Sequence, residues 1–211
     1  LINLAEGAGG TVTSTSNRGH THLPGVIGDT NTSVRLLSMV PVVSAVLGSA
    51  AGGPAIRAVM SHWSVMVAGS SHIFAAGPAL VERSLGRRVE KDELGGSAVA
   101  VDAAGTILDT APDEMAAFAM IRRYLSYMPR NVWEAPPEVA CTDPIDRQDE
   151  ALRTIVPRNR RHPYDMREII RRVFDGGSIM EIQATYGRAV INCLARMNGK
   201  VVGVIASNPM V

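Results

Sequence analysis

The residues with the clearest chemical potential are Gly52 and Gly53, which stand between an apolar run and a segment that opens with Pro54. Residues 46–51 are typical of a buried strand, and proline suits the first turn of a helix, where its missing N–H costs nothing. Without a Cβ, the N–H groups of such a turn can approach an anion and stabilise an oxyanion in acyl transfer or thioester enolate chemistry. Close packing or a plain turn also explains a glycine pair before a helix, and the motif alone favours that interpretation.

Histidines offer weaker patterns. His20 and His22 form an H-x-H pair in a loop rich in glycine, serine and threonine, without a third ligand at a recognisable spacing. We therefore expect no metal site. His62 and His72 flank a predicted strand without a G-x-S-x-G turn beside them, so the sequence supports neither a Ser-His-Asp triad nor a histidine base.

The remaining reactive and charged residues indicate no nucleotide or nucleic-acid site. Cys141 and Cys193 lie far apart without a C-x-x-C or histidine companion, which favours buried or incidental thiols. The basic residues at 158–162 and on the segment after them are interrupted by acidic residues and lack interleaved aromatics, so a solvated linker and helix face is favoured. Neither a P-loop nor a G-x-G-x-x-G after a strand is present.

Composition is typical of a soluble globular protein with close-packed α/β layers. The 211 residues are 46% hydrophobic and 19% charged, with a net charge of +1, which implies no strong electrostatic partner. No apolar run reaches the ~18 to 20 residues that cross a bilayer, and no signal peptide opens the chain. We expect a cytoplasmic protein. Because both ends fall in or just past apolar strand-like runs, we expect a middle section of a longer chain.

Short apolar runs alternate with helical segments, as repeated βαβ-like units do. We expect strands at residues 2–4, 40–47, 64–67 and 72–75, and helices at 33–39, 54–62 and 77–83. Residues 110–113 offer a capping box for a further helix. Its buried face is predicted to hold Met115, Phe118, Ala119, Arg122 and Leu125.

Prolines change the character of the chain after Tyr127, so we predict a domain at residues 1–128, a proline-rich linker at 129–163 and the start of a second domain at 164–211. In this last part, Asp165 caps a predicted amphipathic helix that runs to Phe174. Strands at 190–194 and 201–206 are joined at Asn198-Gly199, a strong signal for a type I′ hairpin.

Taken together, these motifs resemble the carboxyltransferase β subunits of biotin-dependent acyl-CoA carboxylases, of the propionyl-CoA and methylcrotonyl-CoA type. The resemblance covers essentially the whole chain, and many spaced matches are more specific than one glycine pair. The matching segments are L-A-E-G-A-G-G at 4–10, G-G-P-A at 52–55, F-A-A-G-P at 74–78, E-L-G-G at 93–96, D-P-I-D-R at 143–147, I-V-P at 155–157, Y-D-M-R at 164–167 and A-R-M-N-G-K-V-V-G at 195–203.

The resemblance implies an α/β crotonase fold (ClpP/enoyl-CoA hydratase-like) of repeated ββα units, with two such domains in the full-length protein. It further implies a homo-oligomer, a hexamer of β subunits, with active sites between the N-terminal domain of one subunit and the C-terminal domain of another. Gly52 and Gly53 match the catalytic oxyanion pair of the N-terminal domain. By analogy, the substrate is contacted by Gly7, Ala8, Gly9, Pro54, Ala55, Gly77, Pro78, Gly95 and Gly96.

The implied reaction moves a carboxyl group from carboxybiotin to the α carbon of an acyl-CoA, through an enolate held by backbone N–H groups. No E-A-M-K-M carrier motif is present, so biotin must arrive on a separate carrier beside a biotin carboxylase. We expect no metal, membrane or nucleic-acid partner. The partner glycine pair lies in the later part of the C-terminal domain, so the present segment alone is expected to be inactive.

Two departures from the family pattern leave alternatives open. Ala100 stands where the family usually places a histidine, and Gly7-Ala8-Gly9 replaces the common Ser-Gly-Gly or Ser-Ala-Gly. A decarboxylase subunit of a related biotin-dependent pump and a non-catalytic scaffolding paralog therefore stay beside the carboxyltransferase as hypotheses.

Overall fold

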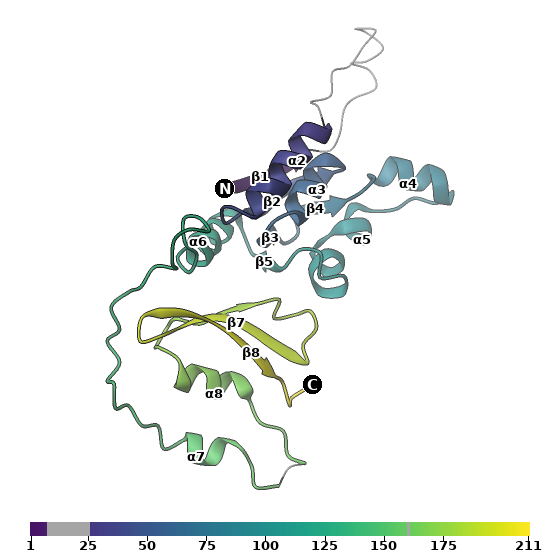
Figure 1. Ribbon diagram of the computed structural model, residues 1–211. Helices are drawn as coiled ribbons and strands as arrows, with labels where there is room; N and C mark the ends of the chain where they lie inside the picture. The colour runs from purple at the N-terminus through teal and green to yellow at the C-terminus, as the bar shows by residue number, and fades with distance from the viewer. Residues whose placement is uncertain (8–25, 160) are drawn as a thin grey trace.

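The central element of the fold is a five-stranded parallel sheet. The computed structural model describes residues 1–7, 26–159 and 161–211 (Figure 1). Strands β1 (Ile2–Gly7), β2 (Val43–Ala51), β3 (Trp63–Val67) and β5 (Asp109–Ala111) lie side by side in that order, and β4 (His72–Phe74) pairs with the last residues of β2. All four pairings are parallel, as connections through helices require.

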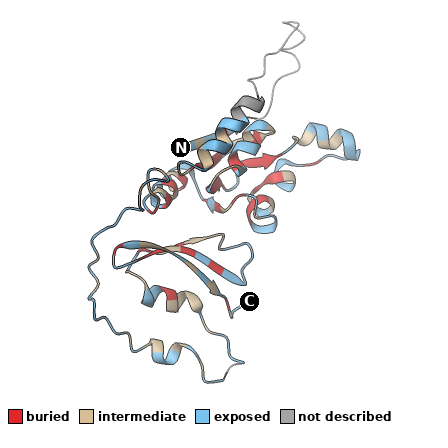
Figure 2. Ribbon diagram, in the orientation of Figure 1, coloured by how far each residue is buried: buried red, intermediate tan, exposed pale blue. Residues whose placement is uncertain are grey.

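Alternate residues of β2 supply two separate cores. Val46 and Ala50 face helix α3 (Gly53–Val59) and the π-helix η1 (Ala98–Ala103). Val43 and Ala45 face α6 (Glu114–Leu125) on the other side of the sheet. Because both faces are covered, apolar residues stand on both faces of the strand rather than on one, and Figure 2 shows the sheet as the most buried part of the chain.

Helices α2 (Val26–Leu37), α4 (Pro78–Leu85) and α5 (Lys91–Gly95) complete the first half of the chain. α4 contains no buried residue and projects from the body of the protein (Figure 1). The following proline-rich stretch forms one short helix, α7 (Leu152–Ile155). None of the helices among the described residues is long and apolar enough to cross a membrane.

The last part of the chain forms an antiparallel sheet of β6 (Met180–Ile182), β7 (Val190–Met197) and β8 (Lys200–Ser207), covered by α8 (Met166–Val173). The predicted hairpin is confirmed, because Met197 pairs with Lys200 across Asn198 and Gly199, both with positive φ. The predicted cap is confirmed too, since the Asp165 carboxylate accepts the Arg167 N–H at 2.9 Å.

The N-terminus of α6 differs from the sequence-based expectation. Thr110 lies in β5, and the cap is Asp113, whose carboxylate accepts the Ala116 N–H at 2.7 Å. The face of α6 that packs on the sheet holds Ala117, Ile121 and Tyr124. Met115 is 71% exposed. The predicted face is therefore confirmed only for Phe118 and Leu125, which pack against the core, whereas Met115, Ala119 and Arg122 are exposed. The side of α6 that faces the sheet is the one from which Tyr124 stacks on Trp63.

A hydrogen-bonded cluster around Asp109 joins the two sheets. The Asp109 carboxylate accepts the indole N–H of fully buried Trp63 at 2.7 Å and the backbone N–H of Gln183, which follows β6, at 3.1 Å. Trp63 in turn stacks on the Tyr124 ring, with centroids 5.3 Å apart. Burial raises the pKa of Asp109 above its ordinary value, and Glu181 adds to the shift, while the two hydrogen bonds oppose it.

This arrangement predicts a specific pH dependence of stability. An acid whose pKa is higher in the folded state binds protons more tightly there, so its contribution to stability is full below the unfolded pKa of about 3.9 and is lost as pH rises through the folded pKa. We expect wild-type stability, measured relative to Asp109→Asn by urea unfolding, to fall over that window and then level off. A flat difference, or one that grows with pH, contradicts this account.

Candidate active site

The turn at Gly52 is fixed by its backbone. Gly52 has φ 62° and ψ −117° and forms the N-cap of α3, a conformation that residues with a Cβ rarely adopt. Its N–H donates to the Phe74 carbonyl of β4 at 3.3 Å, and its carbonyl accepts the Ile56 N–H at 2.9 Å. Both backbone groups of Gly52 are therefore used to hold the turn.

The backbone N–H of Gly53, in contrast, forms no hydrogen bond with the described residues that holds the turn. Gly53 is exposed, and a Cβ built on it meets no atom within 4 Å. Within the described part of the chain, no acceptor receives its N–H, which belongs to the first turn of α3, where helices leave donors free. That turn holds no acidic residue. Neither packing nor a positive φ accounts for glycine here.

The end of β1 lies beside this turn. A Cβ on Gly7 would come within 2.9 Å of the Pro54 ring, so the two motifs are in contact. Glu6 lies over the middle of β2, where a Cβ on Gly48 would be 2.8 Å from its carboxylate. Ala8 and Gly9, predicted to contact substrate, lie outside the described residues, as do His20 and His22.

Ala55 and Ala100 are core residues beneath the turn. Ala55 is 7% exposed and Ala100 3% exposed, and both belong to the apolar cluster that seats α3 on the sheet. The Ala100 carbonyl accepts three hydrogen bonds from the backbone and hydroxyl of Thr106 and the backbone of Ile107. Ala100 therefore holds η1 in shape, and its side chain faces the core.

The glycines at positions 77, 95 and 96 differ in how much space surrounds them. A Cβ on Gly95 would lie 1.9 Å from the Ile73 carbonyl, so glycine allows α5 to contact β4. Gly96 follows α5, with the Asp92 carbonyl 2.9 Å from where its Cβ would be. Gly77 and Pro78 begin α4, and Gly77 has ordinary space around it. Substrate contacts by these residues stay a prediction.

A polar network at the end of β2 was missed by sequence reasoning. His72 is 9% exposed. Its Nε2 lies 3.0 Å from Asp92 Oδ1 and its Nδ1 lies 3.5 Å from Ser49 Oγ. The Lys91 ammonium also donates to Ser49 at 3.3 Å. The network joins α5 to β2 and β4 next to the Gly52 turn. Its residues meet only because Ser49 of β2 pairs with His72 of β4, a contact between residues far apart in the sequence.

The two cysteines take no part in this site. Burial raises the pKa of Cys193 to about 11, and the charge of Glu181 adds to the shift. Cys141, Asp143 and Asp175 place possible ligand atoms within 4.8 Å of one another. Both carboxylates already accept hydrogen bonds, Asp143 from Arg147 at 2.5 Å and Asp175 from the Gly199 N–H at 2.7 Å. This cluster therefore anchors the β7–β8 turn.

Comparison with known proteins identifies the family. The carboxyl transferase domain model matches residues 3–211. The chain belongs to the carboxyl transferase domain family. Among its relatives, the methylmalonyl-CoA decarboxylase subunit alpha of Propionigenium modestum is 35% identical over 82% of this chain and 34% of that protein. The biotin-dependent long chain acyl-coenzyme A carboxylase beta4 subunit of Mycobacterium tuberculosis is 34% identical over 83% of this chain and 34% of that protein.

A solved structure confirms the predicted fold of this carboxyl transferase domain. The transcarboxylase 12S hexamer, determined with methylmalonyl-coenzyme A and methylmalonic acid bound, matches with a TM-score of 0.84 and 30% identity over 89% of this chain and 36% of that one. The carboxyl transferase domain thus has the crotonase-like α/β fold. The chain spans about a third of the length of the curated relatives it matches.

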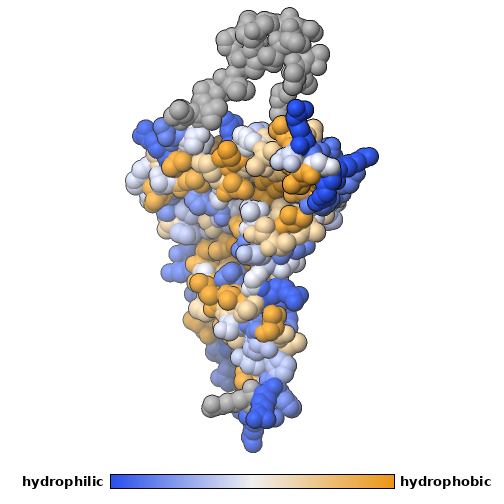
Figure 3. Space-filling model, turned by 90° about the vertical axis from the view of Figure 1, so that its right-hand side faces the viewer, coloured by the Kyte–Doolittle hydropathy of each residue, from blue (hydrophilic) through white to orange (hydrophobic). Residues whose placement is uncertain are grey.

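Helices α3 and α4 both carry exposed apolar side chains, beside exposed charged residues such as Arg57 and Arg83. α3 presents Ile56 and Val59, which are 52% and 45% exposed, and α4 presents Leu80 and Leu85, 66% and 58% exposed. Figure 3 shows apolar side chains gathered over the upper part of the side from which α4 projects.

The contrast between the glycines predicts opposite outcomes for the same substitution. Gly95→Ala forces a methyl group against the Ile73 carbonyl, and we expect a loss of about 1–3 kcal/mol in the free energy of unfolding, as in other overpacked cores. Gly203→Ala, whose Cβ meets no atom within 4 Å, is the control; Gly203 lies within β8, where glycine is about 0.5–1 kcal/mol less favourable than alanine, so this variant should not lose stability. Urea unfolding curves compare them. Equal midpoints would show that α5 does not rest on β4.

Proposed function

We propose that this chain is the part of a biotin-dependent acyl-CoA carboxyltransferase that carries one oxyanion-binding turn, formed by Gly52 and Gly53. The observation that carries the proposal is Gly53: its N–H has no acceptor among the described residues, and no protein atom explains its missing Cβ. An oxygen that gains negative charge during the reaction is the ligand such a donor prefers. Membership of the carboxyl transferase domain family supports the same chemistry.

Each residue of the turn has a distinct role in this proposal. Gly52 holds the turn through its bond to Phe74, and Gly53 donates its N–H to the oxyanion of the acyl-CoA enolate or to the ureido oxygen of biotin. Pro54 starts the helix without adding a competing donor. The first turn of α3 lacks a carboxylate, so its weak positive potential is not cancelled.

The residues present fit a cofactor carried in by another protein. The donor is a backbone group on an exposed turn, which suits an uncharged or anionic oxygen, and Gly53 leaves space for it. Biotin, when carried to this site, would supply the carboxyl group and, on the ureido nitrogen that the carboxyl group leaves, the acceptor for the α-proton of the thioester, so this chain needs no catalytic base. The chain itself orients the acceptor thioester and stabilises charge on its oxygen.

The proposal extends to substrates and partners. We infer an acyl-CoA as carboxyl acceptor, a separate biotinyl carrier with its biotin carboxylase, and a homo-oligomer such as the hexamer named for transcarboxylase 12S. A second candidate is the decarboxylase direction, which the relative from Propionigenium modestum supports. The two candidates share one oxyanion turn and differ in the carboxyl acceptor.

Gly53→Pro in the full-length protein tests the turn directly. Proline suits the first turn of a helix, and a Cβ at this position meets no protein atom, so we expect an unchanged unfolding midpoint and oligomer size. Proline lacks the backbone N–H, so carboxyl transfer to an acyl-CoA should fall about 10²-fold or more, the usual effect of losing one oxyanion donor. Turnover is measured with purified biotinylated carrier and propionyl-CoA as the first acceptor.

Gly203→Ala is the matched control, because Gly203 lies in β8 and a Cβ there also meets no atom within 4 Å. It should leave turnover unchanged. Near-normal turnover of Gly53→Pro overturns the assignment of the turn. A wild-type protein that assembles but neither carboxylates nor decarboxylates any acyl-CoA supports the scaffolding paralog instead.

A further inference from the structure

A cavity lies at the opposite end of the parallel sheet from Gly53. It has a volume of about 190 Å³ and is bounded by the loop that precedes β2, by His62 before β3, by the end of α6 and by the first residues of the linker. Strand β2 has nine residues and so separates this cavity from the glycine turn by about 30 Å. The two sites cannot share one small ligand.

The walls of the cavity are mostly apolar. Leu37, Met39 and Val40 come from the end of α2 and the loop after it, and Val132 comes from the linker. The linker is held in place by the Val132 N–H, which donates to the Met39 carbonyl at 2.9 Å. Among the described residues, no carboxylate, ammonium or guanidinium group lines the cavity, so a charged ligand would be left unpaired.

Two polar groups open into this apolar space without protein partners. Tyr124 is 5% exposed and its ring stacks on Trp63, yet no residue in the described part of the chain bonds its hydroxyl. Burial raises the pKa of Tyr124, and no neighbouring charge or hydrogen bond contributes to that shift. Among the described residues no fully buried side-chain N or O atom lacks a partner, so the unpaired Tyr124 hydroxyl is an accessible group, open to a ligand in the cavity.

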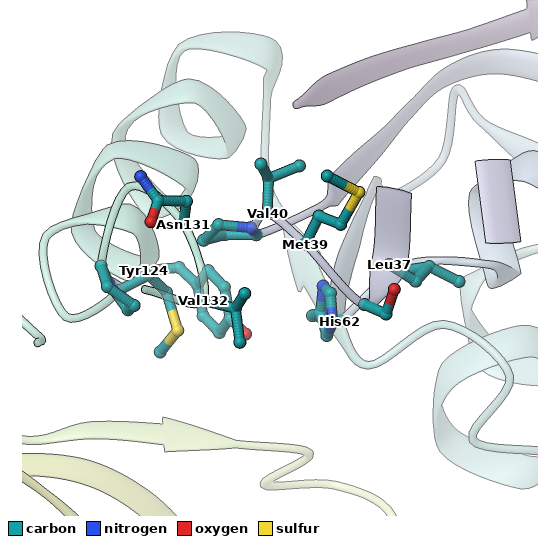
Figure 4. A pocket seen from close by; sticks show the side chains of 11 residues that line it. Leu37, Met39, Val40, His62, Tyr124, Asn131 and Val132 are labelled. Carbon is teal, nitrogen blue, oxygen red and sulfur yellow. The ribbon is translucent and has the colours of Figure 1, made fainter. Parts of the chain in front are cut away.

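His62 supplies the second group. Its Nδ1 accepts the Val42 N–H at 3.0 Å, so the proton of the neutral ring is on Nε2. His62 is exposed, and none of the described residues accepts that proton. In Figure 4, Tyr124 and Val132 lie on one side of the cavity, and His62 lies on the other with Met39 and Leu37. A ligand between them meets a donor on one wall and a hydroxyl on the other.

We propose that this cavity is a second binding site, for a small neutral molecule with an aromatic or branched apolar body and one carbonyl oxygen. The apolar walls accept the body, and the His62 Nε2–H and the Tyr124 hydroxyl donate to the oxygen. Because the linker forms one wall, binding holds residues 129–132 against the loop before β2. The site is independent of the glycine turn and of the carboxyl acceptor.

Benzamide is the probe, since it carries an aromatic ring and a neutral carbonyl. We expect the full-length protein to bind it with a Kd of about 1 mM, the affinity that a ligand of this size reaches, in a ligand-observed NMR titration. Benzoate, which is charged, and toluene, which lacks the oxygen, should bind at least about fivefold more weakly. Val132→Trp fills the cavity and should abolish benzamide binding.

Tyr124→Phe removes only the hydroxyl and keeps the ring on Trp63, so benzamide affinity should fall about five- to tenfold with an unchanged unfolding midpoint. Tyr127→Phe is the matched control: the Tyr127 hydroxyl donates to the Ser178 carbonyl and does not line the cavity. That variant should lower stability and leave the benzamide Kd unchanged. The proposal is overturned if wild-type protein binds no benzamide at 20-fold above the expected ~1 mM Kd, or if Tyr124→Phe binds it equally well.

Discussion

The carboxyl end of strand β2 is the point on which the candidate active site depends. β2 pairs with β1 and β3 along its first half and with β4 along its last three residues. The last pairing brings the Phe74 carbonyl to the Gly52 N–H, and this bond aims the following residue into solvent. A slip of one residue in that register would turn Ile73 away from the core and move the Phe74 carbonyl away from the Gly52 N–H.

The same constraint explains why neighbouring glycines are not equivalent. Gly52 is glycine because its φ is positive, and Gly95 is glycine because α5 must approach the Ile73 carbonyl. Gly53 satisfies neither reason. The sequence does not distinguish these three glycines. The structure does: Gly52 is needed for its backbone conformation and Gly95 for close packing, whereas Gly53 is needed for neither.

Local signals were readable from the sequence, and long-range ones were not. Asn198-Gly199, the Asp165 cap and the strand before Gly52 each depend on a few neighbouring residues, so their prediction succeeded. The buried face of α6 depends on where Tyr124 meets Trp63, and the network at His72 depends on the pairing of β4 with β2. Neither contact produces a hydrophobic periodicity that can be recognised in the sequence, because each joins residues about twenty or more positions apart.

The two ends of the parallel sheet are built differently, and this difference has a physical cause. Ligands of α/β sheets bind at the carboxyl ends of the strands, where helices begin and leave N–H groups free, and Gly53 lies there. At the amino ends the helices finish, so their carbonyls face outward and no donor turn forms. A binding site at this end must take its donors from side chains, which is the role we assign to His62 and Tyr124. The linker supplies the missing wall, since the Val132 bond to Met39 closes a space that the sheet and its helices leave open.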